Sequence, residues 1–285
     1  MSRIAAGRGV TRRKMEGASL DELVRLAGIA AVDARALMRA ALGVDDAYLI
    51  AHPGQPLTNR QRARYLAWVE RRRSGEPVAY VTGEREFYSL DFKVTPAVLI
   101  PRPETELLVE SALERIPREA PYRVLELATG CGCVAVAIAL HRPRARGTAT
   151  DVSRDALLIA RENAARHDAG VEFVESDWFA ALAGRRFHLI VCNPPYVAER
   201  DPHLQEGDLR FEPRAALVAG PDGLACIRLI VAQARAHLDP GGSLLLEHGH
   251  DQATRCRALL EQAGYREVAS RRDLAGIERV TGGSV

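Results

Sequence analysis

The sequence has 285 residues, of which 47% are hydrophobic and 27% are charged. This composition is typical of a folded globular protein, and the length favours two domains. The 39 Lys and Arg residues against 37 Asp and Glu give a formal net charge of +2, which offers no argument for a nucleic-acid-binding protein. The apolar runs reach only about ten residues, whereas a membrane-spanning helix needs roughly twenty.

Residues 1–84 are expected to form a small helical bundle that docks a substrate, after a disordered tail over residues 1–17. Ser19–Glu22 and Thr58–Gln61 have the pattern of N-terminal capping boxes, and residues 31–42 show helical spacing that ends at Gly43. A short helix is expected over residues 45–52. The expected core comprises Leu23, Leu26, Leu37, Leu42, Leu49, Leu66 and Val69, with Trp68 more consistent with the core than with a stacking surface.

The first ninety residues carry a net charge of +5, and the rest of the chain carries −3. Part of this charge gathers on the helix expected from Thr58 to Arg73. Its basic face is either simply solvated or contacts an acidic partner or RNA. The face comprises Arg60, Arg64, Arg71, Arg72 and Arg73.

Residues 85–100 are interpreted as a hairpin linker, because residues 87–94 alternate like a strand. Residues 103–106 suit the first turn of a helix, with Pro early and acids near the positive end. Strand and helix patterns alternate from Tyr122 onward, so residues 101–285 are predicted to be an α/β domain with a doubly wound, mostly parallel, seven-stranded sheet. Strands are expected at 124–127, 148–152, 171–175, 187–192, 243–247, 265–270 and 277–281, and helices at 133–140, 155–167, 222–238 and 251–263.

A glycine-containing loop, Glu126–Gly132, follows the first strand of this predicted sheet. Glycines let the backbone approach a ligand and let the next helix present its N-terminus to it. Asp151 ends the second strand, where a carboxylate can bind ribose hydroxyls. The spacing A-x-G-x-G differs from the G-x-G-x-x-G of nicotinamide dehydrogenases, which disfavours that class. The loop alone is a weak indicator of nucleotide binding.

The sequence Asn193-Pro194-Pro195-Tyr196 follows the strand expected at 187–192. Ligands of open α/β sheets bind beyond the carboxyl ends of the strands. Two prolines stiffen the loop and remove two N–H donors, which leaves the Asn193 side-chain oxygen and the Pro194 carbonyl as acceptors. Together they can accept both hydrogens of a planar –NH2 group, while Tyr196 offers a flat face to that group.

This arrangement suits methyl transfer from a sulfonium to a nitrogen. Positive charge grows on the nitrogen during attack, and fixed acceptors stabilise it in the transition state. The alternative is a rigid Asn-Pro turn without function, which the position after a compatible cofactor loop disfavours.

These stretches together resemble the N5-glutamine methyltransferases of class-1 peptide chain release factors, the PrmC/HemK family. The resemblance covers about residues 19 to 283 and is specific where NPPY combines with IPRPETE (100–106) and RFEP (210–213). Further matching stretches are REFYSLDF (85–92), LELATGCG (125–132), SDWF (176–179), LLLEHG (244–249) and ERVTGG (278–283).

The resemblance implies S-adenosyl-L-methionine as cofactor and the glutamine of a release factor's GGQ loop as substrate. It implies that Asn193, Pro194 and Tyr196 are catalytic and that Asn193 to Tyr196 hold the substrate glutamine. Two departures from the family are Glu126 and Ala128, where Asp and Gly are usual. A methyl group at position 128 is expected to tighten the loop. The implied cofactor-binding residues are Glu126, Ala128, Thr129, Gly130, Cys131, Gly132, Asp151, Asp177, Trp178 and Asn193.

Several alternatives remain open from the sequence. An adenine or guanine amino-methyltransferase would share the clamp, and a non-catalytic S-adenosylmethionine- or RNA-binding module is a rival of another class. No metal is expected, although Cys131 with Cys133, or His248 with His250 and Asp251, are conceivable ligands. Arg102 and Glu104 either line the mouth of the site or form a structural turn. The five cysteines contain no C-x-x-C pair, which favours a reducing compartment, the cytoplasm.

Overall fold

The computed structural model describes residues 17–285 and divides into two compact units, one ending at Gly83 and one spanning Glu84–Val285. The expected tail of residues 1–17 therefore lies almost wholly outside the described residues. Within residues 17–285, no helix combines the length and the apolar character that crossing a membrane requires.

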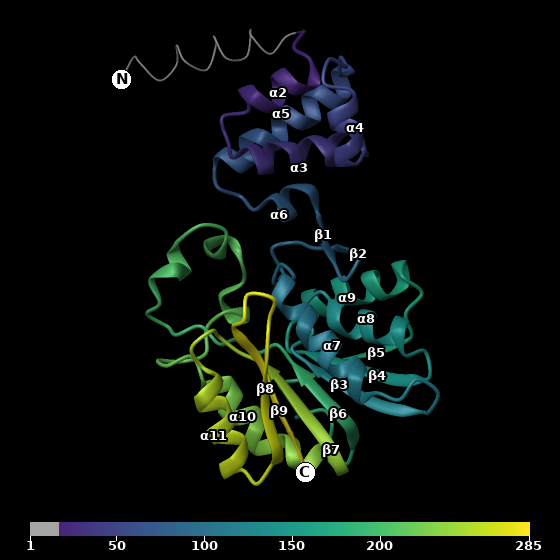
Figure 1. Ribbon diagram of the computed structural model, residues 1–285, viewed down its shortest axis with the longest axis vertical. Helices are drawn as coiled ribbons and strands as arrows, with labels where there is room; N and C mark the ends of the chain where they lie inside the picture. Colours follow the sequence, from purple (N-terminus) through teal and green to yellow (C-terminus); the bar gives the residue numbers. More distant parts are fainter. Residues whose placement is uncertain (1–16) are drawn as a thin grey trace. The chain divides into compact units, whose positions relative to one another are not determined.

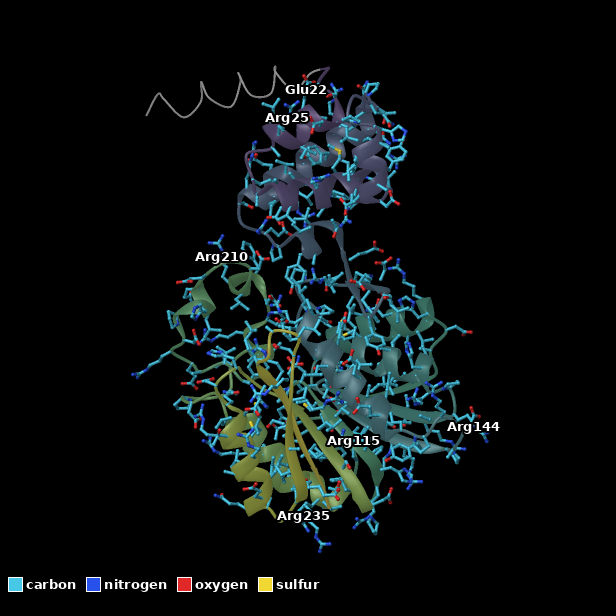
Figure 2. The ribbon with its side chains drawn as sticks, viewed as in Figure 1. Glu22, Arg25, Arg115, Arg144, Arg210 and Arg235 are labelled. Atoms are coloured by element: carbon cyan, nitrogen blue, oxygen red, sulfur yellow. The ribbon has the colours of Figure 1, made fainter. Side chains whose placement is uncertain are left out.

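The first unit is helical, and both expected capping boxes are present. In one of them, the backbone N–H of Ser19 donates to the Glu22 carboxylate at 2.8 Å, and Glu22 and Arg25 lie on the same short helix (Figure 2). Gly43 ends a helix with a φ of 71°, a left-handed conformation that glycine adopts at little cost. The helices are α2 (Leu20–Leu26), α3 (Ala31–Leu42), α4 (Asp46–Ala51), α5 (Asn59–Arg73) and α6 (Val78–Thr82).

The core of this unit is close to the expected one. Leu23, Leu37, Leu49 and Val69 are buried, whereas Leu26 is 39% exposed. Leu42, Leu66 and Trp68 are partly buried against the same core. The fully buried Tyr65 was not predicted, because it sits among arginines on α5.

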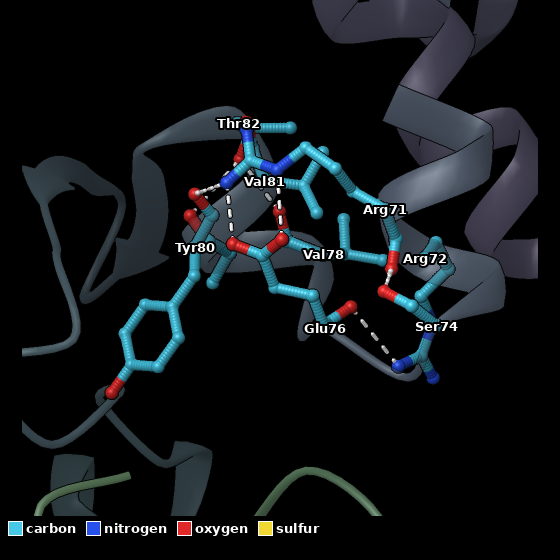
Figure 3. A network of polar contacts seen from close by, with 9 residues as sticks. Arg71, Arg72, Ser74, Glu76, Val78, Tyr80, Val81 and Thr82 are labelled. Atoms are coloured by element: carbon cyan, nitrogen blue, oxygen red, sulfur yellow. Dashed lines mark hydrogen bonds and ion pairs between the residues drawn. The ribbon is translucent and has the colours of Figure 1, made fainter. Parts of the chain in front are cut away.

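Three of the five arginines on the basic face of α5 hold the unit together, and Figure 3 shows two of them, Arg71 and Arg72. The Arg71 guanidinium pairs with Glu76 and donates to the carbonyl oxygens of Tyr80 and Val81, both at 3.2 Å. Arg72 donates to Asp33 on α3 at 2.7 Å, and Arg73 donates to the Ala27 carbonyl at 2.8 Å. Arg71 and Arg73 are exposed, as expected of a solvated face, but all three side chains also have partners within the unit, which the sequence did not predict.

The second unit begins with a hairpin formed by β1 (Glu84–Phe87) and β2 (Leu90–Lys93). Its two turn residues, Tyr88 and Ser89, have φ values of 53° and 60°. Their backbone N–H groups donate to the carboxylates of Glu106 and Glu86, at 2.9 and 2.7 Å, which holds the turn in this left-handed conformation.

A seven-stranded sheet forms the rest of the second unit, in the order β5-β4-β3-β6-β7-β9-β8. The strands from β5 to β7 are parallel, and β9 runs antiparallel to both of its neighbours. Helices α7, α8 and α9 lie on one side of the sheet, and α10 and α11 lie on the other (Figure 1). This is the predicted doubly wound α/β fold.

The alternation of strand and helix patterns located every strand of this sheet, although β7 begins at Leu238 rather than at the predicted residue 243. It did not predict the short 3-10 helices between residues 202 and 216, which have no apolar periodicity. The strands are β3 (Tyr122–Leu127), β4 (Ala145–Asp151), β5 (Val171–Glu175), β6 (Phe187–Cys192), β7 (Leu238–Glu247), β8 (Arg266–Arg272) and β9 (Glu278–Ser284), and the helices are α7 (Glu106–Arg115), α8 (Cys133–His141), α9 (Arg154–Arg166), α10 (Ala225–Ala234) and α11 (Ala253–Gln262).

The fully buried Asn163 on α9 joins the hairpin to the loop after β3. Its Oδ1 accepts from the Lys93 N–H at 2.8 Å, and its Nδ2 donates to the carbonyl oxygens of Lys93 and Cys131, at 3.0 and 2.9 Å. One side chain thus satisfies three backbone groups, of which the Cys131 carbonyl is buried. The hairpin belongs structurally to the second unit.

We expect Asn163→Ala to lower the free energy of unfolding by roughly 2–4 kcal/mol, because three backbone groups lose their partner. The neighbouring substitution Glu162→Ala removes only an exposed ion pair with Lys93 and should cost less than about 1 kcal/mol. Urea unfolding of both variants measures the difference. Equal stabilities would contradict the assigned role of Asn163.

Candidate active site

A cavity of about 240 Å3 lies at the carboxyl ends of β3, β4, β5 and β6. The chain leaves β3 toward β4 on one side and reaches β6 on the other, so the cavity sits at the topological switch point of the sheet. Seven of the predicted site residues line it: Ala128, Gly130, Asp151, Asp177, Trp178, Asn193 and Pro195. Glu126, Thr129, Cys131, Gly132, Pro194 and Tyr196 are not among the lining residues.

Glu126 lies beneath the loop after β3, with its side chain buried. The same carboxylate oxygen, Oε2, accepts from the Thr129 hydroxyl at 2.6 Å and from the Ala135 N–H at 3.0 Å. Burial raises the pKa of Glu126 to about 8, against the effect of these two hydrogen bonds. Glu126 therefore supports the loop and the start of α8 from behind.

The loop itself needs left-handed backbone at three positions. Ala128, Gly130 and Gly132 have φ values of 52°, 57° and 83°. A side chain at 132 would meet the Cβ of Ala160 at 3.1 Å, so Gly132 permits close packing of α8 on α9. A Cβ at Gly130 would meet nothing within 4 Å. At Ala128 the left-handed conformation costs on the order of 1–2 kcal/mol, which is the strain that the methyl group introduces.

Asp151 braces this loop from the end of β4. Its Oδ2 accepts from the Gly130 N–H and its Oδ1 from the Ser153 N–H, both at 2.9 Å. Burial raises the pKa of Asp151, and these backbone hydrogen bonds oppose that rise. A carboxylate is thus held at the cavity wall by two backbone N–H groups, one from the loop after β3 and one from its own turn. Beside it, Trp178 follows β5 and packs partly on the hydrophobic core, whereas Asp177 is exposed.

Asn193 is the first residue after β6, and its amide has a fixed orientation. Its Nδ2 donates to the Thr105 hydroxyl at 3.1 Å, which turns Oδ1 to the other side of the amide. Pro194 and Pro195 are buried behind it. The Tyr196 hydroxyl donates to Oε1 of the buried Glu247 at 3.3 Å. Hydrogen bonds thus hold the first and last side chains of the clamp, Asn193 through Thr105 and Tyr196 through Glu247.

The backbone after the clamp is held by Gln252, a buried residue before α11. Its Nε2 donates to the Tyr196 carbonyl at 2.9 Å and to the Gly223 carbonyl at 3.4 Å. A Cβ at Gly223 would lie 2.3 Å from the Tyr196 carbonyl oxygen. The path of the chain after Tyr196 thus requires a glycine at position 223.

Two segments from outside the sheet complete the cavity, residues 97–99 and 213–216. Buried Glu212 joins them, because its carboxylate pairs with Arg102 and accepts from the Ile100 N–H at 3.0 Å. This contact places IPRPETE and RFEP side by side. Sequence reasoning missed these lining residues, since Ala, Val, Leu and Pro carry no chemical signature. Arg102 and Glu104 are not among the lining residues, and Arg102 makes a structural pair instead.

Three of the conceivable metal ligands, Cys131, Cys133 and His248, have other partners. A hydrogen bond to Cys131 and burial raise the pKa of Cys133 well above its usual range, so that it stays protonated. His248 is buried, with its ring nitrogens 2.9 Å from the Gly249 carbonyl and 2.7 Å from the Thr281 hydroxyl. Residues 17–285 contain no cluster of three or more His, Cys, Asp and Glu side chains suited to a metal ion.

The sequence is similar to those of named methyltransferases over nearly its whole length. The release factor glutamine methyltransferase of Burkholderia pseudomallei strain K96243 is 54% identical, over 95% of this chain and 97% of the relative. That of Bordetella pertussis strain Tohama I is 50% identical, over 93% and 98%. This chain belongs to the release factor glutamine methyltransferase family.

Domain families agree with this membership. Residues 22–83 match the PrmC N-terminal domain and residues 103–208 match the methyltransferase small domain. Among solved structures, a methyltransferase from Pyrococcus furiosus shares the fold with a TM-score of 0.52 at 19% identity, over 80% of this chain and 98% of that chain. The family resemblance read from NPPY, IPRPETE and RFEP is therefore confirmed.

The raised pKa of Glu126 predicts a pH dependence of stability. Because the folded-state pKa of about 8 lies above the ordinary value of 4.5, unfolding releases a proton between these two pH values. The free energy of unfolding must therefore fall as the pH rises through that window. In Glu126→Gln the amide oxygen can replace Oε2 as acceptor, so we expect a slope shallower by up to about 1.4 kcal/mol per pH unit.

Urea unfolding at several pH values between 5 and 8 measures this slope. Glu172→Gln is the control, because the pKa of exposed Glu172 is lowered by its hydrogen bond to Arg185. Its contribution to stability is lost only at acidic pH, as the pH falls through that lowered value. A Glu126→Gln slope equal to that of the wild type would show that Glu126 is already ionised at pH 5.

Proposed function

We propose that this protein transfers the methyl group of S-adenosyl-L-methionine to the side-chain amide nitrogen of the glutamine in the GGQ motif of class-1 peptide chain release factors. The observation that carries the proposal is the Asn193–Tyr196 clamp at the switch-point cavity, with the amide of Asn193 turned by Thr105. The relatives named for the same substrate class support it.

The residues around the cavity fit S-adenosylmethionine. The Asp151 carboxylate suits ribose hydroxyls, Val152 and Trp178 offer apolar walls to an adenine ring, and the backbone at Gly130 is open to an approaching ligand. When bound, this cofactor supplies a methyl group activated by a sulfonium. We assign Asp151, Trp178 and, from the loop 128–132, Ala128 and Gly130 to cofactor binding. Glu126, Thr129, Cys131 and Gly132 support that loop without lining the cavity.

The clamp residues act on the substrate amide. Asn193 Oδ1 and the Pro194 carbonyl accept the two hydrogens of the glutamine –NH2, which leaves its nitrogen lone pair facing the methyl donor. As the new N–C bond forms at the expense of the sulfonium–methyl bond, the nitrogen gains positive charge, and both acceptors bind its hydrogens more tightly. The cationic nitrogen then loses one proton to water. Pro195 and the Tyr196 ring limit the rotation of the planar amide.

The rival from the same enzyme class is a nucleobase amino-methyltransferase, because an exocyclic –NH2 presents the same two hydrogens. The near-neutral charge of +2 disfavours it. The fixed orientation of the Asn193 amide disfavours a non-catalytic binding module, because such a module does not need to orient an acceptor toward a reacting nitrogen. We further propose that the helical residues 17–84 dock the release factor. We assign the reaction to the cytoplasm, where the five free cysteines remain reduced.

Asn193→Ala should separate chemistry from binding. We expect S-adenosylmethionine affinity within a few-fold of the wild type, and a single-turnover rate of release-factor methylation lower by roughly a hundredfold or more. Asn193→Asp retains an acceptor, so its rate should lie between the two. Calorimetry and labelled methyl transfer at saturating cofactor measure both quantities. A wild-type rate in Asn193→Ala would make Asn193 a turn residue and remove the proposed mechanism.

The docking role predicts a dependence on the whole substrate. A peptide that carries only the GGQ loop should be methylated with a far lower kcat/KM than the intact release factor, because remote contacts supply orientation. Duplex DNA and ribosomal RNA, offered under the same conditions, should not be methylated. Equal kcat/KM for peptide and intact factor would contradict docking, and methylation of nucleic acid alone would favour the rival enzyme class.

A further inference from the structure

Trp178 has a backbone conformation that bulky residues rarely adopt. Its φ is 48°, in the left-handed region, where the side chain of an L-residue crowds the following carbonyl oxygen. Within residues 17–285, six residues other than glycine have a φ in this region, and two of them, Ala128 and Trp178, line the switch-point cavity. An unfavourable backbone conformation persists only where neighbouring groups enforce it. The surroundings of Trp178 must therefore hold it in place.

The hydroxyl group of Ser176 makes the contacts that do this. Ser176 follows β5 and is 6% exposed. Its hydroxyl donates to the Trp178 carbonyl oxygen at 2.9 Å and accepts from the Ala181 N–H at 3.0 Å. One hydroxyl thus uses both its donor and an acceptor to close the turn formed by residues 176–181. The conformation of Trp178 is therefore tied to a single side chain two residues before it.

Both ends of this turn are attached to the second unit by contacts that do not involve Trp178. The Ser176 N–H donates to the Asp151 carbonyl oxygen at 3.0 Å, which joins the turn to the end of β4. Phe179 is buried in the core, and its ring stacks on His237 with 4.7 Å between the ring centroids. The turn therefore keeps its place in the fold even if Trp178 changes its conformation.

We propose that Ser176 is a positioning residue that holds the Trp178 indole at the wall of the cofactor cavity. This inference rests on the proposed function, which assigns Asp151 and Trp178 to cofactor binding. Ser176 lines the same cavity, but its hydroxyl already donates its proton to Trp178 and accepts from Ala181, so it acts through Trp178. Through its backbone and its side chain, Ser176 links the residue assigned to the ribose with the residue assigned to the adenine.

The effect on binding follows from the population of the binding-competent conformation. Without the hydroxyl, Trp178 can relax to the right-handed or extended backbone that a tryptophan prefers, which turns its ring away from its present position. The cofactor then binds only the molecules that still have a left-handed Trp178, so the apparent dissociation constant rises by the inverse of their fraction. Methyl transfer in the saturated enzyme is unaffected, because other contacts hold Asn193 and Tyr196.

Ser176→Ala should raise the dissociation constant of S-adenosylmethionine about three- to tenfold by calorimetry. The single-turnover rate of release-factor methylation at saturating cofactor should stay within about twofold of the wild type. Ser111→Ala is the matched control, because its buried hydroxyl donates to the Leu107 carbonyl at 2.6 Å on α7, and it should change neither quantity. A wild-type dissociation constant in Ser176→Ala would overturn the proposal.

Fluorescence follows the position of the Trp178 ring directly. The chain has two tryptophans, so Trp68→Phe leaves Trp178 as the only one. In this background and without cofactor, Ser176→Ala should shift the emission to longer wavelengths, because the ring leaves its packing against the core. Saturating S-adenosylmethionine should reverse the shift, since it selects the left-handed conformation. An emission spectrum that Ser176→Ala leaves unchanged would show that the ring does not need the hydroxyl, which overturns the proposal.

The double variant Ser176→Ala/Trp178→Ala tests whether Ser176 acts through the tryptophan. If it does, the double variant should bind S-adenosylmethionine as weakly as Trp178→Ala, within about twofold. A further loss of affinity would give Ser176 a separate role and overturn the proposal. Melting temperatures of all variants, each expected within a few degrees of the wild type, show that the compared proteins are folded.

Trp178→Ala alone distinguishes failure of this inference from failure of the proposed function. Weak binding by Trp178→Ala with wild-type binding by Ser176→Ala defeats only the positioning role. Wild-type binding by Trp178→Ala defeats the assignment of Trp178 to the cofactor, and the positioning role with it.

Discussion

The second unit depends on the switch point of its sheet, between the parallel strands β3 and β6. From β3 the chain adds strands toward one edge, and from β6 it adds them toward the other. The loops that follow β3 and β6 lead to helices on opposite faces of the sheet. The two loops therefore diverge, and no helix of the second unit covers the crevice between them. One loop contributes Ala128 and Gly130, and the other contributes Asn193 and Pro195. Everything else at the site adjusts how these two loops face each other.

Carboxyl groups that are buried or partly buried make most of these adjustments. Glu126 supports the first loop, Asp151 braces it from the side, Glu212 closes the rim and Glu247 stands behind the clamp. Burial raises the pKa of each, which means that each resists ionisation where it sits. Burying these carboxyl groups lowers the stability of the fold, but it places hydrogen-bond acceptors with fixed directions at the carboxyl edge of the sheet. Such acceptors can aim backbone N–H groups and hydroxyls in ways that apolar packing cannot.

Much of the fold followed from the sequence, because period-two and helical patterns report burial directly. The capping boxes at Ser19 and Thr58 and the strand ends at Asp151 and Asn193 were visible in the same way, since each combines a special residue with a change of pattern. The contribution of Ala97–Leu99 and Ala215 to the cavity was not visible, because small apolar residues look the same in a wall and in a core.

The sequence also did not predict which residues far apart in the chain form hydrogen bonds or ion pairs with each other. Arg71, Arg72 and Arg73 follow one another in sequence and suggest one charged face, yet their ion pairs and carbonyl acceptors lie on different elements of the first unit. Thr105 and Asn193 are 88 positions apart, and their hydrogen bond joins the turn before α7 to the loop after β6. Sequence patterns report how a residue meets the solvent or the core, and they say little about which partner it meets.

Gly223 shows how a residue without a side chain can constrain the chemistry of a site. The space that a Cβ would need there is occupied by the Tyr196 carbonyl oxygen, which Gln252 holds in place. Any side chain at position 223 would therefore displace the Tyr196 carbonyl, and with it the clamp. In an evolving lineage this position would tolerate as little variation as a residue that touches the substrate. A search for catalytic residues by sequence variability alone would rank it among them, although its role is only to stay out of the way.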